Sequence, residues 1–309
     1  MSTSFTFSAG LASGFHHTPL LRVKGPDAVA FLHRLSTQKL QAEPSQARLL
    51  CVLDKKGRIQ ELGQAMATDD EVLFLGWPGV ARSPQETLEP FHFAEELEMS
   101  QVFAEIGLVV GPSSLAPYEA ATSGALHFFG APTVIFDGES SPALWVFSEK
   151  IGQVNAYLAS HDVDKGSATD WENLRIQTGW PAFGAEASPK SNPLELELHD
   201  ALSWTKGCYV GQEVISRIDN YDKQARRLVG IQLEKTLAVS AEQDVEIYLD
   251  SSAVGKVTSL APDAKYALAM LKVASEASDG CDVELRVGGV VVAKGQTKRR
   301  HFAQLPHDG

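Results

Sequence analysis

The feature that most constrains the fold is a succession of short β-rich stretches after residue 225. They recur at roughly ten-residue spacing, with turn residues between them. In order they read RRLVGIQLE, DVEIYLD, AVGKVTSLA, YALAMLKV and DVELRVGGVVVAKGQ. Gly288 and Gly289 separate two β-rich runs, a pattern typical of a two-residue hairpin turn. Five or six successive strands predict a small antiparallel β-barrel over residues 226–309.

Residues 1–225 instead alternate strand-like and helix-like stretches. PLLRVKG reads as a strand, and Pro26 with Asp27 after it favours a helix start. The next apolar stretch predicts a hairpin that turns at Asp54–Gly57. The chain contains neither G-x-G-x-x-G nor a Walker motif, so a doubly wound nucleotide-binding fold is not indicated. We expect an α+β region with two interleaved subdomains.

Two further helical segments are predicted in this region. The segment 83–102 has helical composition interrupted by Pro90. ATDWENLRIQTG predicts a helix with Thr169 or Asp170 as N-cap and Gly179 at its end. The stretches GALHFF, PTVIFD and ALWVFS predict three separate short strands.

Composition and charge limit the classes of function. The net charge is −12, which argues against broad, sequence-independent binding of nucleic acid. The run from Lys298 to Arg300 reads as a solvated charge cluster. No apolar stretch approaches the length of a membrane span, and the first residues resemble neither a secretory signal nor a transit peptide. We therefore expect a cytoplasmic protein that acts without a membrane.

The three cysteines are Cys51, Cys208 and Cys281, and no two of them have C-x-x-C spacing. This spacing predicts no disulfide framework and no self-contained zinc or iron–sulfur site. A reducing compartment suits such a set. Cys51 in LLCVL and Cys281 at a turn read as structural residues.

The densest chemistry lies in KGCYVGQE, residues 206–213. A nearby cation favours the thiolate form of a cysteine, and Lys206 is two positions from Cys208, a spacing that places both side chains on one face of an extended segment. Two alternatives stay open: free cysteines are most often buried and inert, and a Cys–His pair with His199 is conceivable. The remaining candidates are two glycines that permit tight turns, an aromatic residue, and an amide and a carboxylate at a helix start: Gly207, Gly211, Tyr209, Gln212 and Glu213.

A second dense stretch is DWENLRIQTGWPAFG. Trp171 and Trp180 flank a helix that carries Arg175. A tryptophan can stack on a flat heterocycle, and an arginine can pair with a carboxylate through two hydrogen bonds. The plainer interpretation is a pair of core tryptophans.

Together these stretches resemble one family. KGCYVGQE resembles the K-G-C-[YF]-x-G-Q-E signature of the YgfZ-type folate-binding proteins, which are relatives of the glycine-cleavage T protein, an aminomethyltransferase. VKGPDAVAFLHRLST, LLCVLDKKGRI and WENLRIQTGWPAFG resemble further family segments in the same order. The resemblance implies folate-binding modules around a central channel, followed by the C-terminal barrel.

The same resemblance implies a role and a set of site residues. The role is that of a tetrahydrofolate-binding accessory protein for the assembly or repair of iron–sulfur enzymes, with an indirect effect on tRNA modification. Its partners would be iron–sulfur client or assembly proteins. Cys208 and Lys206 would carry any chemistry. Folate contacts would come from Trp171, Arg175, Gly207, Tyr209, Gly211, Gln212 and Glu213.

Two alternatives accompany this expectation. One is a folate-dependent aminomethyl or methyl transferase, so whether the chain is an enzyme is left open. The other is an interaction module with a vestigial folate site. The chain departs from the family pattern at three positions. Thr18 lies near the place where some relatives carry a second tryptophan, Lys39 is at a position where many have an acid, and Leu194 is where they have glutamine. These departures bear on the folate contacts and on one-carbon transfer.

Overall fold

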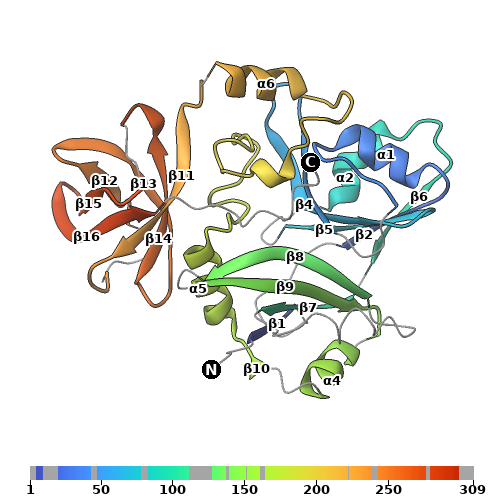
Figure 1. The fold of residues 1–309 in the computed structure, drawn as a ribbon, viewed down its shortest axis with the longest axis horizontal. Helices are drawn as coiled ribbons and strands as arrows, with labels where there is room; N and C mark the ends of the chain where they lie inside the picture. The colour runs from blue at the N-terminus through green and yellow to red at the C-terminus, as the bar shows by residue number, and fades with distance from the viewer. Residues whose placement is uncertain are drawn as a thin grey trace.

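The computed structural model describes residues 5–9, 20–42, 47–77, 83–102, 104–110, 127–136, 139–150, 152–160, 164–221, 223–237, 243–275 and 279–298. Within these residues the strands form two five-stranded sheets and a closed six-stranded barrel. Figure 1 shows the three groups in a roughly triangular arrangement, with the barrel in orange and red. The predicted α+β fold class with a C-terminal antiparallel barrel is confirmed.

The first sheet has the strand order β3-β4-β5-β2-β6 and is antiparallel throughout. Its strands are β2 (Leu20–Lys24), β3 (Arg48–Leu53), β4 (Ile59–Ala67), β5 (Glu71–Gly76) and β6 (Glu98–Val102). Helix α1 (Ala28–Leu35), helix α2 (Pro84–Leu88) and the 3-10 turn η1 (Glu89–Phe91) accompany it. Helix α1 buries one face at i, i+3, i+4 and i+7, through Ala28, Phe31, Leu32 and Leu35. Both faces of β3 and β5 are buried, which explains the continuous apolar runs of these two strands.

The second sheet has the order β10-β1-β7-β9-β8. Its strands are β1 (Phe5–Ala9), β7 (Glu105–Val110), β8 (His127–Phe136), β9 (Glu139–Ser148) and β10 (Asp164–Lys165). Helices α4 (Gln153–Ser160) and α5 (Ala168–Thr178) belong to this part of the chain. Because β1 pairs with β7 and β10, the chain enters this sheet first and returns to it after completing the other one.

The barrel closes in the order β11-β14-β13-β12-β15-β16. Its strands are β11 (Arg226–Leu233), β12 (Glu246–Leu249), β13 (Ser252–Leu260), β14 (Tyr266–Lys272), β15 (Asp282–Val287) and β16 (Val290–Lys298), with the 3-10 turn η3 (Val273–Ser275) after β14. Gly288 and Gly289 have φ angles of 56° and 83°. Two successive positive φ angles are typical of the predicted type of hairpin turn. The 3-10 turn η2 (His199–Ala201) and helix α6 (Gln212–Asn220) precede the barrel.

Several local predictions were wrong. The stretch 83–102 ends in a strand, β6, because it pairs with β2 at the edge of the first sheet. GALHFF and PTVIFD contribute to one long strand, β8, which continues through an irregularity after Ala131. The N-cap of α5 is Ser167, and Asp170 is the reciprocal N3 partner in a capping box. The predicted end of α5 at Gly179 is confirmed by its left-handed φ of 87°.

One hydrophobic cluster joins all three groups of strands, and we call it the central cluster. It includes Leu49 and Leu75 of the first sheet, Leu108 of the second, Trp171 of α5 and Leu268 of the barrel. Two satellite cores lie between the first sheet and α1, and inside the barrel. The three parts therefore bury apolar surface against one another.

No helix within the described residues has both the length and the apolar character that a bilayer crossing needs.

Candidate functional site

The signature loop, residues 203–213, is attached to helix α1 through Lys206. The Lys206 side chain is buried, and its ammonium donates to the carbonyls of His33 at 2.5 Å, Ser36 at 2.5 Å and Gln38 at 3.2 Å. These carbonyls lie at the C-terminal end of α1, where backbone acceptors lack helical partners and carry partial negative charge. Lys206 therefore caps the helix as it holds the loop.

The environment of Lys206 shifts two pKa values. Burial lowers the pKa of Lys206 to about 8, which leaves it an ammonium at neutral pH. Its Nζ lies 5.3 Å from the centroid of the Tyr209 ring, within the range of a cation–π contact. Burial raises the pKa of Tyr209 to about 12, with the nearby Cys51 adding to the rise. Tyr209 thus acts as a neutral aromatic wall beside the cation.

Thr37 provides the second attachment of this region. Its hydroxyl donates to the carbonyl of Ala201 at 2.5 Å and accepts from the backbone N–H of Cys51 at 2.8 Å. Its own carbonyl accepts from the N–H of Ser203 at 2.9 Å. Thr37 is fully buried and so joins β3 to the start of the signature loop.

Gly211 and the hairpin turn between β3 and β4 form the third attachment. Gly211 is the N-cap of α6 and has a φ of +84°. A Cβ at this position would lie 2.5 Å from the carbonyl oxygen of Asp54 and 3.0 Å from the Cα of Gly57. On the other side of the contact, a Cβ on Gly57 would lie 3.2 Å from Val214 and Ile215 of α6. Both glycines are needed for this close approach.

Cys208 lies on the surface between these attachments. Cys208 and Gly207 are both exposed, and Cys208 is a free thiol. The expectation that Lys206 and Cys208 share one face is not met, because Lys206 points inward to α1. Glu213 is exposed and pairs with Arg217 at 2.7 Å, and Gln212 is half-buried at the first position of α6. The proposed role of Cys208 as a functional thiol stays a prediction.

Trp171 belongs to a buried chain of three tryptophans. Its ring centroid lies 5.5 Å from that of Trp180 in an edge-on arrangement, and Trp180 lies 5.5 Å from Trp77. All three are 6% exposed or less, and the indole N–H of Trp77 donates to the carbonyl of Pro181. Trp171 and Cys208 therefore lie in different environments, one in the central cluster and one on the surface. The folate-stacking role of Trp171 stays a prediction.

Arg175 is occupied by protein partners. Its guanidinium donates to the carboxylate of Glu172, to Glu186, to the carbonyl of Trp180 and to the hydroxyl of Ser259 in the barrel. Glu186 also accepts from Ser259 at 2.6 Å and has a fully buried side chain. This network fastens α5 and the segment after it to β13. With these contacts made, no guanidinium N–H is left to bind a carboxylate of a ligand.

His199, the alternative partner for Cys208, is engaged elsewhere. Its Nε2 lies 3.7 Å from Glu197, and that neighbouring carboxylate raises the pKa of His199. Glu197 in turn pairs with Arg227 of β11 at 2.7 Å. Glu197 has a φ of +58°, which is uncommon for a residue with a side chain. Glu197 and Arg227 thus form a second ionic contact that ties the chain before the signature loop to the barrel.

Two residues of interest were not predicted from the sequence. Thr37 gave no signal, because a hydroxyl that bonds backbone groups distant in sequence leaves no local pattern. Gln64 is polar and alternates with the apolar residues Leu62 and Met66 along β4, which is a local pattern that the sequence does show. It is 3% exposed, and neither its amide nitrogen nor its amide oxygen has a hydrogen-bond partner in the described part of the chain.

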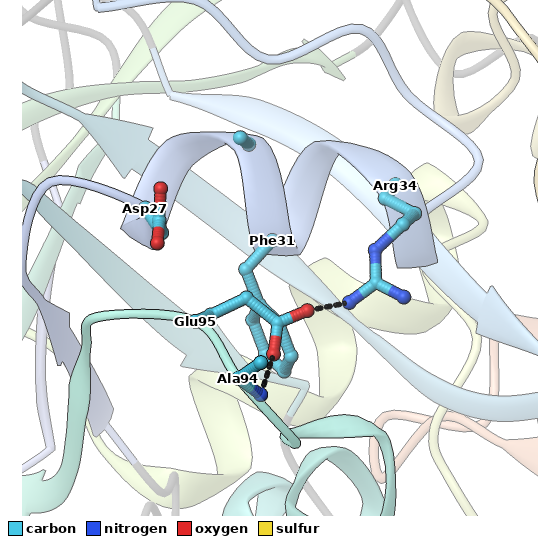
Figure 2. Close-up of a pocket in the computed structure, with 6 residues that line it drawn as sticks. Asp27, Phe31, Arg34, Ala94 and Glu95 are labelled. Carbon is cyan, nitrogen blue, oxygen red and sulfur yellow. Dashed lines mark hydrogen bonds and ion pairs between the residues drawn. The ribbon is translucent and has the colours of Figure 1, made fainter.

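A surface depression lies between α1 and the segment that contains Ala94 and Glu95. It has a volume of about 360 Å³ and is lined by Asp27, Ala30, Phe31, Arg34, Ala94 and Glu95. Figure 2 shows Glu95 bridging the Ala94 backbone N–H and the Arg34 guanidinium. None of the site residues predicted from the sequence lines this depression. Within the described residues, no group of three or more His, Cys, Asp or Glu side chains is arranged to hold a metal ion.

Comparisons with known proteins agree with this geometry. No protein-family model matches the chain. A chloroplastic protein of Arabidopsis thaliana, described by its name as a transferase, is 28% identical over 79% of this chain. The tRNA-modifying protein YgfZ of Serratia proteamaculans is 25% identical over 74% of the chain and 73% of its own length. A mitochondrial iron–sulfur cluster assembly factor of Mus musculus, IBA57, is 28% identical over 72% of this chain.

The matches cover only part of some relatives. They span 60% of the Arabidopsis protein and 66% of the mouse protein. Among solved structures, the glycine cleavage system aminomethyltransferase T from Bartonella henselae superposes with a TM-score of 0.75 over 97% of this chain and 86% of its own, at 17% identity. That likeness shows a shared fold. The expected resemblance to YgfZ-type proteins with an aminomethyltransferase-like fold is confirmed.

Proposed function

We propose that this chain, which resembles the YgfZ-type proteins, is a folate-binding accessory protein for the assembly or repair of iron–sulfur enzymes. The observation that carries the proposal is the way the signature loop is held. Lys206 fixes the loop to α1, Gly211 fixes it to the turn at Gly57, and Cys208 is left exposed between them. A surface thiol on a fixed loop suits contact with a partner protein.

The proposed role of Cys208 is that of a thiol offered to a partner or to a labile cluster. One cysteine cannot hold an iron–sulfur cluster alone, because such clusters take several thiolate ligands. An iron–sulfur client or assembly protein would supply the others. The names of the bacterial and mouse relatives support this role, and an effect on tRNA modification would follow indirectly through iron–sulfur enzymes. The proposed site of action is the cytoplasm, where free cysteines stay reduced.

Tetrahydrofolate or a derivative is the proposed ligand, and it would supply a one-carbon carrier. The unpaired amide of Gln64 supports the fit, because a buried polar group without a partner suits a ligand with complementary donors and acceptors. Arg175 gives no such support, since protein groups already occupy its donors. Trp77, Trp171 and Trp180 form an apolar wall in the same cluster.

The proposal is tested by expressing the chain in a bacterial strain that lacks its own YgfZ-type protein. We expect restored activity of [4Fe–4S] enzymes, and quenching of tryptophan fluorescence when tetrahydrofolate is added to the purified protein. Restoration without quenching would support an interaction module with a vestigial folate site. Turnover of methylene-tetrahydrofolate with an amine donor would instead support a transferase. The proposal is contradicted if the enzymes stay inactive.

A further inference from the structure

The buried amide of Gln64 is at odds with its surroundings. Gln64 lies in β4, directly opposite Leu49 of β3 and Leu75 of β5. Residues directly opposite in an antiparallel pair point to the same face of the sheet. Because Leu49 and Leu75 both belong to the central cluster, the Gln64 side chain faces that cluster too. An amide with four hydrogen-bonding positions thus lies among apolar side chains.

Such a placement is costly unless something pairs with the amide. A buried polar group without a hydrogen bond is destabilising by about 1–3 kcal/mol in mutational data. A leucine or methionine would fill a similar volume without this penalty, as Leu62 and Met66 do two positions away on the same face. Among the residues that the structure describes, none provides a partner for either amide atom. A partner from outside the chain would remove the cost.

We infer that Gln64 is a specificity-determining contact for the polar edge of a folate pterin ring. This inference rests on the proposed function and extends it to a residue that the family signature does not include. A pterin edge carries a carbonyl, a ring N–H and an amino group side by side. A carboxamide offers one acceptor and a pair of donors in a plane, so it can bind such an edge through two hydrogen bonds, as Gln does with adenine.

The tryptophans support the same assignment. Trp77 lies just past the end of β5, and its backbone N–H donates to the carbonyl of Leu62 at 2.8 Å. Leu62 precedes Gln64 by two residues on β4, and Trp77 and Leu62 both belong to the central cluster that Gln64 faces. Trp180 contacts Trp77, and Trp171 contacts Trp180. Aromatic rings and an unpaired amide in one cluster are the combination that suits a flat, polar-edged heterocycle.

The test compares Gln64→Leu with wild type and with Gln60→Leu. Gln60 is a half-buried residue on the same strand and donates to the Arg58 carbonyl, so it controls for the chemical change. We expect ligand-free Gln64→Leu to melt at or above the wild-type temperature. We expect its dissociation constant for tetrahydrofolate, measured by calorimetry, to rise at least tenfold. Gln60→Leu should bind as wild type does.

The outcomes separate this inference from the proposed function. Equal affinity of wild type and Gln64→Leu would overturn the role of Gln64 and leave folate binding intact. No binding by the wild type would overturn both. A clear loss of stability in ligand-free Gln64→Leu, repeated in Gln64→Met, would mean that the protein itself pairs the amide, and would overturn the inference as well.

Discussion

Gly211 and Gly57 lie back to back, so that a Cβ on Gly211 would approach the Cα of Gly57 to 3.0 Å. The two residues are 154 positions apart, yet this contact joins the N-terminus of α6 to the turn between β3 and β4. It fixes the C-terminal end of the signature loop to the first sheet. Cys208 lies three residues before Gly211, so the contact also determines where the thiol is displayed.

The first prediction is that Gly211→Ala is destabilising by about 1–3 kcal/mol, measured by urea unfolding. Its positive φ and its clash with the Asp54 carbonyl both oppose a side chain. Gly289→Ala has a positive φ but open space, and Gly207→Ala has open space without a positive φ. We therefore expect Gly289→Ala to lose an intermediate amount of unfolding free energy, and Gly207→Ala to lose almost none. Equal losses at all three positions would exclude a special contact at Gly211.

The second prediction concerns Lys206→Met, which keeps most of the buried stem and removes the ammonium. Three carbonyls at the end of α1 would lose a charged donor, and we expect a loss of about 2–3 kcal/mol in the free energy of unfolding. Lys39→Met is the matched control, because Lys39 is exposed on the same connection. If the two variants unfold alike, the cap contributes nothing to stability.

The third prediction is an acid-dependent change at Glu95. Its carboxylate accepts from the N–H groups of Phe93 and Ala94 and pairs with Arg34, and chiefly the Phe93 bond lowers its pKa to about 2 from 4.5. Because the folded-state pKa is depressed, the associated stability is present above about pH 4.5 and is lost as the pH falls through about 2.

The measurement for Glu95 is thermal unfolding across this pH range. Glu95→Gln should show a smaller loss of stability on acidification than wild type, and Glu96→Gln, which alters an exposed neighbour, should follow the wild-type curve. A wild-type-like acid profile in Glu95→Gln would show that this carboxylate is not linked to folding.

The fourth prediction is that Glu186→Gln weakens the attachment of α5 to the barrel. Glu186 is the buried carboxylate between Arg175 and Ser259, and removing one partner of a buried ion pair typically costs about 3–5 kcal/mol. The exposed side of the network, through Glu172, keeps part of the pairing, so we expect about 3 kcal/mol in urea unfolding. Ser259→Ala should cost about 1 kcal/mol. A smaller effect at Glu186 than at Ser259 would contradict the assignment.

The sequence predicted the elements whose signals are local. The glycine pair in the last hairpin, the charged turn at Asp54–Gly57 and the end of α5 at Gly179 each follow from residue types that a turn or helix end requires. Strand β6 was not predicted, because it forms by pairing with β2, and local composition does not reveal that pairing. Ser167 was not predicted as the N-cap of α5, because Thr169 and Asp170 are equally good N-cap residues by type.

In the candidate site, too, the features with local signals were predicted, and those that depend on distant segments were not. The spacing of KGCYVGQE predicted a shaped loop, and Gly211 does adopt the positive φ that glycine permits. The direction in which Lys206 points is set by α1, more than 170 residues earlier in the chain, so two-residue spacing gave the wrong face. For Arg175, the partner Ser259 comes from the distant barrel. Trp171 contacts Trp180 within the same stretch, in agreement with the plainer interpretation of a pair of core tryptophans.

We propose that Cys208 is a functional thiol displayed by a fixed loop. The direct test is Cys208→Ala, expressed in a strain that lacks its own YgfZ-type protein, with Cys281→Ala as the control for loss of a thiol elsewhere. Cys208 is exposed, so the variant should melt at the wild-type temperature. We expect Cys208→Ala to fail to restore [4Fe–4S] enzyme activity, and Cys281→Ala to restore it. Full restoration by a stable Cys208→Ala protein would show that the Cys208 thiol has no such role.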